Sequence, residues 1–143
     1  MEDELERETA ARLAQACAAH GFAAGWSLEF PWEPGDWVPT ANHVALSPAG
    51  LEAVSKDVCI GSCFVLVEAL DRFAVTSDGD LYCMLAGPRP FVEAALGTTV
   101  EAQLLAFGKN VEDYGASGAR VGSILRAVQA VAVAACAHSK GPA

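Results

Sequence analysis

The sequence predicts a mixed α+β fold with an N-terminal helix, an antiparallel or mixed sheet of three to five strands, and two C-terminal helices packed on that sheet. Three observations predict this class. Apolar residues recur at helical spacing at the start of the chain, apolar and polar residues alternate between turn signals in its middle, and helical spacing returns beyond residue 98. No internal repeat or linker interrupts this order, so we expect a single globular domain over 1–143.

The composition suits one domain with its own core. The chain has 143 residues, of which 52% are hydrophobic and only 19% are charged. A chain of this length can bury roughly 70% of the surface that it exposes when unfolded. The apolar content is therefore sufficient for a packed interior and too high for a disordered segment.

The first element is a one-sided helix. Leu5, Thr9, Leu13 and Cys17 recur every fourth residue, and charged or polar residues fill the positions between them. Acidic residues stand in the first turn, where they suit the positive end of the helix dipole. Gly21 can adopt the left-handed conformation that ends a helix, so we expect the helix to stop there.

Residues 22–30 alternate in the way that a strand with one covered face does. The apolar side chains of one face are those of Phe22, Ala24, Trp26, Leu28 and Phe30, and we expect this face to be the covered one. The following residues, 31–39, contain three prolines and one glycine. Such a stretch excludes regular structure and predicts a loop.

The next elements are shorter. We expect a strand over 43–46, and then a helix, because Ser47 is a good cap and Pro48 suits the first helical position. Residues 58–67 are nearly uncharged and rich in β-branched and aromatic residues. This pattern predicts a central strand buried on both faces, although its periodicity alone also allows a buried helix.

A hairpin over 73–85 is the clearest local prediction. Two strand-like runs, 73–76 and 81–85, flank an Asp78-Gly79 pair, which is a strong signal for a tight hairpin turn. Asp78 and Asp80 are read as turn residues rather than calcium ligands, because the other ligands of a calcium loop do not follow.

The C-terminal part predicts two helices. Thr98 and Glu101 fit a capping box, and apolar spacing continues from there until Gly115. A second helix is expected over 119–137, and it is apolar nearly all round. Such a helix must be covered, either within one chain or by a second copy, so a homodimer is one expectation.

Charge and cysteine content restrict the partners and the compartment. The net charge is −9, from 18 acidic and 9 basic residues, which disfavours nucleic acid and anionic membrane surfaces. The longest apolar stretch, 127–137, is too short to span a bilayer. Five cysteines without dense spacing, and an acidic start unlike a secretory signal, predict a protein of the reducing cytoplasm.

The segment 26–37 is the candidate binding surface. It combines all three tryptophans with three carboxylates and has no basic residue, and the partner-binding candidates are Trp26, Glu29, Trp32, Glu33, Asp36 and Trp37. Rigid aromatic side chains lose little entropy on binding, and carboxylates complement a basic partner. The competing interpretation is that the tryptophans close the edge of the sheet as part of the core.

A second candidate set could bind a metal or carry out chemistry. It consists of Cys59, Cys63, Cys83 and His43, whose side chains are zinc ligands in other settings. In an extended strand Cys59 and Cys63 would lie about 13 Å apart, too far for one metal ion, so we interpret these cysteines as core thiols. The glycines from 115 to 122 lack the preceding strand of a phosphate-binding loop, and no catalytic residue set or cofactor is predicted.

The sequence therefore favours a small acidic protein-binding module whose partner is a basic protein. An inhibitor or an immunity-type protein would be a module of this class. The alternative is a small enzyme or metal-binding domain that uses the cysteine and histidine set. The absence of a catalytic constellation favours a non-enzymatic role.

Overall fold

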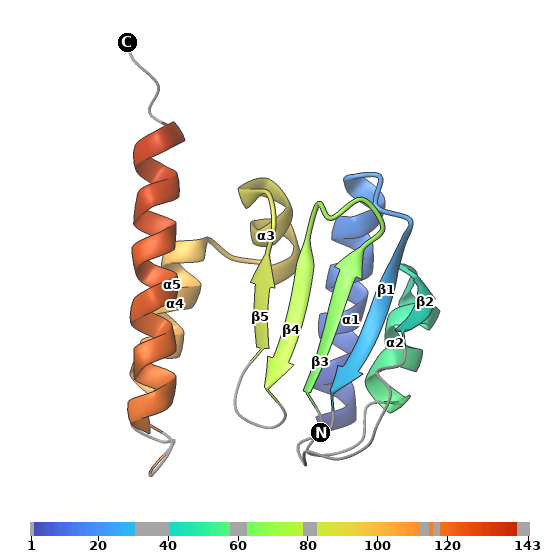
Figure 1. The fold of residues 1–143 in the computed structure, drawn as a ribbon, viewed down its shortest axis with the longest axis horizontal. Coiled ribbons are helices and arrows are strands. Elements are labelled where there is room, and N and C mark those ends of the chain that lie inside the picture. Colours follow the sequence, from blue (N-terminus) through green and yellow to red (C-terminus); the bar gives the residue numbers. More distant parts are fainter. Residues whose placement is uncertain are drawn as a thin grey trace. The chain divides into compact units, whose positions relative to one another are not determined.

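The computed structural model describes residues 2–30, 41–57, 63–78, 83–111, 115 and 118–139. It confirms the mixed α+β fold, with an N-terminal helix, a five-stranded antiparallel sheet that includes a hairpin, and two C-terminal helices (Figure 1). The elements in order are α1 Glu2–Ala19, β1 Ala24–Phe30, β2 Ala41–Ala45, α2 Pro48–Asp57, β3 Cys63–Glu68, β4 Ala74–Asp78, β5 Cys83–Ala86, α3 Arg89–Leu96, α4 Val100–Asn110 and α5 Gly118–Ser139. They form two compact units, Met1–Gly97 and Thr98–Ala143, which are described separately.

The sheet belongs to the first unit. Its strand order is β2-β1-β3-β4-β5, and every neighbouring pair is antiparallel. β3 is the central strand, as the sequence predicts for this region. β4 and β5 pair with Ala74 opposite Ala86, which confirms the predicted hairpin, although residues 79–82 of its turn lie outside the described residues.

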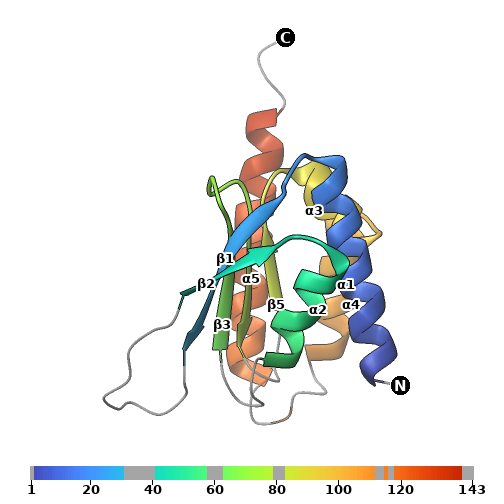
Figure 2. The same cartoon turned by 90° about the vertical axis from the view of Figure 1, so that its right-hand side faces the viewer.

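Three helices lie on one face of this sheet. α1 contacts both α2 and α3, and Figure 2 shows all three on the same side of the strands. The core between helices and sheet contains a cluster of three aromatic rings, Phe22, Phe73 and Phe91, with ring centroids 4.6–5.4 Å apart. Aromatic pairs at this spacing add about 1 kcal/mol each to the hydrophobic contribution of burial.

The covered face of β1 is the opposite of the one that the alternation pattern suggested. Gly25 and Ser27 are buried toward the helices, whereas Trp26 is 45% exposed and Leu28 is only half-buried. The residues of β1 on the helix side are small, and α1 contributes small buried residues of its own, Ala14 and Ala16. The large aromatic residue that fills this side, Phe22, precedes the strand rather than belonging to it.

β3 is likewise buried on one face rather than on both. Leu66 is buried toward the helices, while Val65 and Val67 on the other face are half-buried. Within the described part of Met1–Gly97, no helix covers that second face (Figure 2).

α1 ends as predicted. Gly21 has a φ of 72°, in the left-handed region, and the Phe22 amide donates a hydrogen bond to the Cys17 carbonyl oxygen at 2.8 Å. Cys17 is fully buried, but Thr9 is exposed, so the buried stripe of α1 is displaced from the every-fourth-residue spacing of the sequence.

The second unit is a helical hairpin made of α4 and α5. A Cβ placed on Gly118 would lie 3.3 Å from the Val111 carbonyl oxygen, and one on Gly108 would lie 3.3 Å from Leu125. Contact partners on α4 have lower residue numbers as the numbers on α5 rise, so the two helices are antiparallel. The N-cap of α4 is Thr99, whose hydroxyl oxygen accepts a hydrogen bond from the Ala102 amide at 3.1 Å, so the predicted cap at Thr98 is off by one residue. Among the described residues, no helix is both long and apolar enough to cross a membrane.

Candidate protein-binding surface

The face of the sheet opposite the helices is apolar. Strand register places Trp26 between His43 and Val67, and Leu28 between Ala41 and Val65. Directly paired residues of antiparallel strands point to the same face, so the register defines the whole surface. We call the middle of this surface the open sheet face, and it consists of Ala41, His43, Trp26, Leu28, Val65, Val67, Ala74, Thr76, Met84 and Ala86. The same register continues to Ala24 and Ala45 at one end, and to Phe30, Cys63 and Asp78 at the other.

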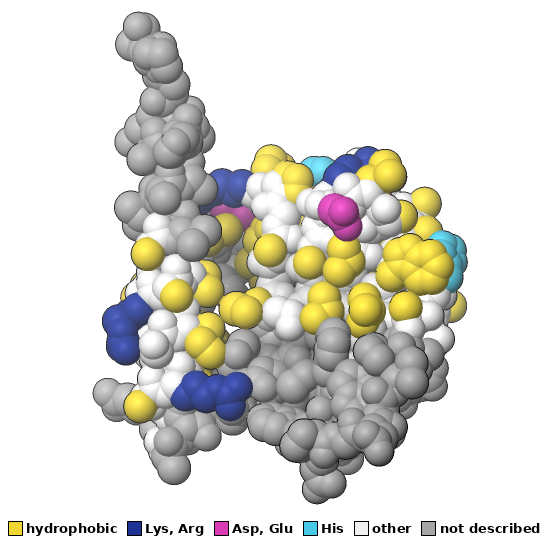
Figure 3. All heavy atoms as spheres, in the orientation of Figure 1, with side chains coloured by type: hydrophobic (Ala, Val, Ile, Leu, Met, Phe, Trp, Pro, Cys, Tyr) yellow, Lys and Arg dark blue, Asp and Glu magenta, His cyan; other side chains and the backbone are white. Residues whose placement is uncertain are grey.

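None of these ten residues is Asp, Glu, Lys or Arg. Figure 3 shows hydrophobic side chains spread across the sheet on this side. On a chain with a net charge of −9, the open sheet face itself has no acidic residue, and the register places Asp78 at its end. An apolar, charge-free area with charge around it is the composition of an interface core and its rim.

Trp26 is the largest side chain of the open sheet face. It is 45% exposed, and its ring packs edge-to-face against His43, with centroids 5.2 Å apart and an angle of 79° between the planes. Because β1 pairs with a strand on each side, the backbone of Trp26 is held in a ladder rather than in a loop. The indole is thus presented to solvent from a rigid support.

Gly25 contributes to this support from the other face of β1. A Cβ at Gly25 would lie 2.5 Å from the carbonyl oxygen of Val67, which is a backbone atom and cannot move aside cheaply. Glycine therefore permits the close approach of β1 to β3 next to Trp26.

Only two of the six binding residues predicted from the sequence lie in the described part of the structure. Trp26 lies on the open sheet face, but Glu29 has the opposite parity on β1 and is half-buried on the helix side. The structure thus does not bring Trp26 and Glu29 to one face of the strand. Trp32, Glu33, Asp36 and Trp37 lie in 31–40, outside the described residues, so their part of the hypothesis stays a prediction.

The candidate metal ligands are spread over the sheet. His43 is on β2 and Cys83 on β5, at opposite edges, which are roughly 19 Å apart at about 4.8 Å per strand. Cys63 is on the central strand, and Cys59 lies outside the described residues. Within the described ranges, no three His, Cys, Asp or Glu residues form a group that could hold a metal ion. Cys83 is exposed, so its interpretation as a core thiol is wrong, whereas Cys17 is buried.

A buried ion pair at the end of β3 was not predicted from the sequence. Glu68 is only 2% exposed, and its carboxylate accepts hydrogen bonds from Arg72 Nη2 at 2.6 Å, Arg72 Nε at 3.1 Å, and the amides of Leu70 and Arg72. The guanidinium also lies 4.6 Å from the centroid of the Phe22 ring. The pair closes the β3–β4 turn, in which Asp71 has a φ of 58°.

This arrangement changes the titration of two groups. The hydrogen bonds from Arg72 lower the pKa of Glu68 from 4.5 to about 2, against the opposing effect of burial. Burial, together with the negative charge of Glu68, raises the pKa of the Cys17 thiol to about 11. The sequence signal was an acid and a base four residues apart after an apolar run. That spacing is read as a helical pair or as solvent-exposed charge unless the turn is known.

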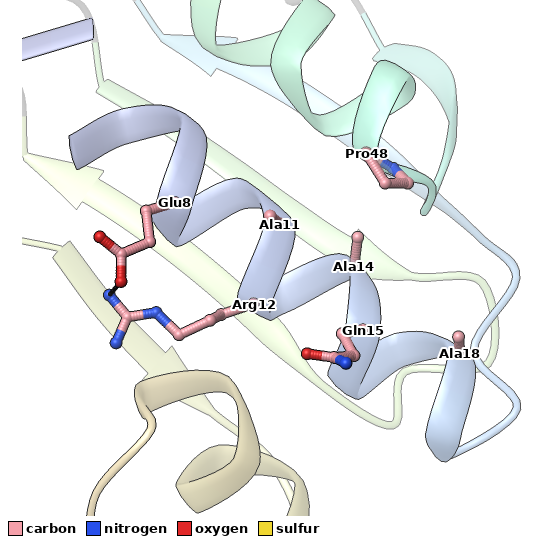
Figure 4. Close-up of a pocket in the computed structure, with 7 residues that line it drawn as sticks. All are labelled: Glu8, Ala11, Arg12, Ala14, Gln15, Ala18 and Pro48. Atoms are coloured by element: carbon pink, nitrogen blue, oxygen red, sulfur yellow. Dashed lines mark ion pairs between the residues drawn. The ribbon is translucent and has the colours of Figure 1, made fainter. Parts of the chain in front are cut away.

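A shallow groove of about 460 Å³ runs along α1 (Figure 4). Its lining residues are Glu8, Ala11, Arg12, Ala14, Gln15, Ala18 and Pro48. Arg12 Nη1 donates a hydrogen bond to the Leu96 carbonyl oxygen at 3.3 Å, and Arg12 Nη2 lies 3.7 Å from Glu8 Oε1. These contacts tie α1 to the end of α3, and the groove holds no pair of groups arranged for catalysis among the residues that line it.

No protein-family model matches the chain. No curated protein matches it, and no solved structure does so either.

Proposed function

We propose that this chain is a small acidic protein-binding module that occupies a basic partner protein, in the manner of an inhibitor or an immunity-type protein. The contact core is the open sheet face with Trp26 as its principal residue. The observation that carries the proposal is an indole, 45% exposed, on a rigid apolar sheet face of a chain with a net charge of −9.

The exposed part of Trp26 is large enough to act as a binding hot spot. A tryptophan side chain presents about 250 Å², so burying the remaining 45% would remove roughly 110 Å² from water. At about 25 cal/mol per Å², this burial is worth about 3 kcal/mol. Residues whose truncation costs about 2 kcal/mol or more dominate typical interfaces, and tryptophan is enriched among them.

The net charge of the chain favours a partner whose own net charge is positive. The open sheet face is uncharged, so recognition of a basic protein depends on the acidic residues around it, including the predicted rim of Glu33 and Asp36. Such a field accelerates the encounter with a basic protein and repels nucleic acid and anionic membranes. The association rate should then fall as salt is added, whereas the dissociation rate should depend on Trp26.

The proposal also places the chain in a reducing cytoplasm. Cys83 is exposed near one end of the edge strand β5, and Cys17 is a buried free thiol. A reducing compartment keeps both in the thiol form.

Capture with a photo-crosslinking residue at Thr76, on the open sheet face, tests the proposal. Tagged chain is exposed to extract of the native source, irradiated, and the crosslinked protein is identified by mass spectrometry. Trp26→Ser is compared with Leu70→Ser, since Leu70 is 71% exposed but lies in the β3–β4 turn, off the open sheet face. We expect one basic protein that the original chain and Leu70→Ser both capture, and that Trp26→Ser loses. An acidic target, no target, or a target unaffected by Trp26→Ser would refute the proposal.

A further inference from the structure

His43 shares the open sheet face with Trp26. It lies on β2, at one edge of the sheet, and is the direct partner of Trp26 in the antiparallel register. His43 is exposed, and its ring centroid lies 5.2 Å from that of the indole, with 79° between the two ring planes. The two rings are in contact, so a protein that covers the exposed part of Trp26 also meets the imidazole.

The neighbours of His43 on this face are uncharged. Ala41 and Ala45 lie on either side of it along β2, and β1 presents Trp26 and Leu28 on the same face. The imidazole is therefore the one group of the open sheet face that can gain a charge near neutral pH.

The charged residues of β1 and α2, the elements that contact β2, belong to the other side of the sheet. β1 contains only Glu29, whose parity along the strand is opposite to that of Trp26. α2 contains Glu52, Lys56 and Asp57, and this helix lies on the far face together with α1 (Figure 2). No carboxylate of these two elements is thus placed to stabilise a charged imidazole.

We propose, on the basis of the function proposed above, that His43 belongs to the contact core and that the basic partner covers it, together with Trp26, by apolar side chains. The imidazole is then neutral in the complex. A charged imidazole in a contact without a carboxylate would lose its water with no compensating interaction. The partner also carries excess positive charge, so a proton on His43 adds repulsion between like charges.

Protonation of His43 should therefore weaken binding. Histidine side chains change charge between pH 5 and 8, whereas ordinary carboxylates stay ionised in this range, so the acidic residues that favour a basic partner keep their charge. When a group must release a proton on binding, the Kd rises up to tenfold for each pH unit below the range in which the group titrates. We expect the Kd to be roughly tenfold higher at pH 5.5 than at pH 7.5.

Titration calorimetry with the basic protein captured through Thr76 tests the contact at His43. The Kd is measured at both pH values and constant ionic strength for the original chain, His43→Gln and His20→Gln. Glutamine takes up no proton in this range, so the ratio of the two Kd values should fall from roughly ten to about one in His43→Gln.

His20 provides the matched control. It is also exposed, but its ring packs against Phe22 and Phe91 on the helix side of the sheet, with centroids 5.9 Å and 5.6 Å away. His20→Gln should therefore keep the ratio of the original chain. The partner is the same in every titration, so its own protonation cancels when the ratios are compared.

The fold should be intact at both pH values. The pKa of Glu68 is lowered to about 2, so the stability that its ion pair with Arg72 contributes is retained above pH 4.5. Circular dichroism of each variant at pH 7.5 and pH 5.5 checks this.

The results separate a failure of this contact from a failure of the proposed function. If no basic protein is captured, or if Trp26→Ser still binds it, the proposed function is refuted and the contact at His43 with it. If Trp26→Ser loses the partner but His43→Gln keeps the Kd ratio of the original chain, the contact at His43 alone is refuted. An affinity that rises as the pH falls, and only with His43 present, would place a partner carboxylate against the imidazole and overturn the apolar contact.

Discussion

Glu68→Gln tests the reasoning about the buried ion pair. The substitution keeps the size of the side chain and one acceptor oxygen for the Leu70 amide, but it removes the negative charge that faces Arg72. The pKa of Glu68 lies at about 2 instead of 4.5, and this difference corresponds to about 3 kcal/mol at 1.36 kcal/mol per unit. Arg72 is 41% exposed, so solvent screens part of the interaction, and we expect a loss of about 2 kcal/mol at pH 7.

The pH dependence of this loss has a definite sign. A carboxyl whose pKa is lower in the folded state stabilises the fold above its unfolded pKa, near 4.5, and this contribution disappears as the pH falls toward 2. The difference in unfolding free energy between the original chain and Glu68→Gln should therefore be largest at neutral pH and shrink below pH 4.5. Urea titrations followed by circular dichroism at several pH values measure it.

Glu93→Gln is the matched control. Glu93 also accepts a hydrogen bond from an arginine Nε at 3.1 Å, from Arg89, but that pair lies on the surface of α3. An exposed pair four residues apart on a helix is worth about 0.3–0.5 kcal/mol. Equal effects of the two substitutions, or an effect of Glu68→Gln that does not change with pH, would refute the account of the ion pair.

Three further predictions concern the support of the sheet, the start of α4 and the core thiol. Gly25→Ala should lower the unfolding free energy by about 2 kcal/mol in urea titrations, because its Cβ would meet the Val67 carbonyl oxygen at 2.5 Å; an unchanged midpoint would contradict this contact. Thr99→Ala should lower the unfolding free energy by about 1 kcal/mol in the same measurement, and Thr98→Ala should lower it much less. A larger loss for Thr98→Ala than for Thr99→Ala would show that Thr98 is the N-cap, as the sequence suggested. Cys17 should resist alkylation at pH 8 in the folded chain and react on unfolding, since burial raises its pKa to about 11; peptide mapping that shows rapid labelling of the native chain would refute this.

The sequence was sufficient where the signal is local. Gly21 ends α1 through its own backbone conformation, and the hairpin formed by β4 and β5 follows from a turn pair between two apolar runs. The extent of α5 likewise follows from helical spacing alone. None of these predictions requires knowledge of what packs against the element.

Tertiary packing decided what the sequence could not. Alternation along β1 shows that its two faces differ, but not which face the helices cover. The helices cover the side of Gly25 and Ser27, and the large aromatic residue of this side, Phe22, comes from outside the strand. This choice left Trp26 half exposed, so the sequence indicated Trp26 as a binding candidate but did not indicate its neighbours on the open sheet face.

The Glu68–Arg72 pair shows a second limit. Its carboxylate is satisfied by two backbone amides and a guanidinium that converge only when the β3–β4 turn has formed. A sequence gives the order of these residues, but not the turn that brings their donors together.

The affinity of the captured basic partner for Trp26→Ser tests the central claim most directly. Titration calorimetry would compare this variant with the original chain and with Leu70→Ser. Loss of about 3 kcal/mol should raise the Kd of Trp26→Ser roughly a hundredfold, with little change for Leu70→Ser. An unchanged Kd for Trp26→Ser, or equal losses in both variants, would show that the open sheet face is not the contact core.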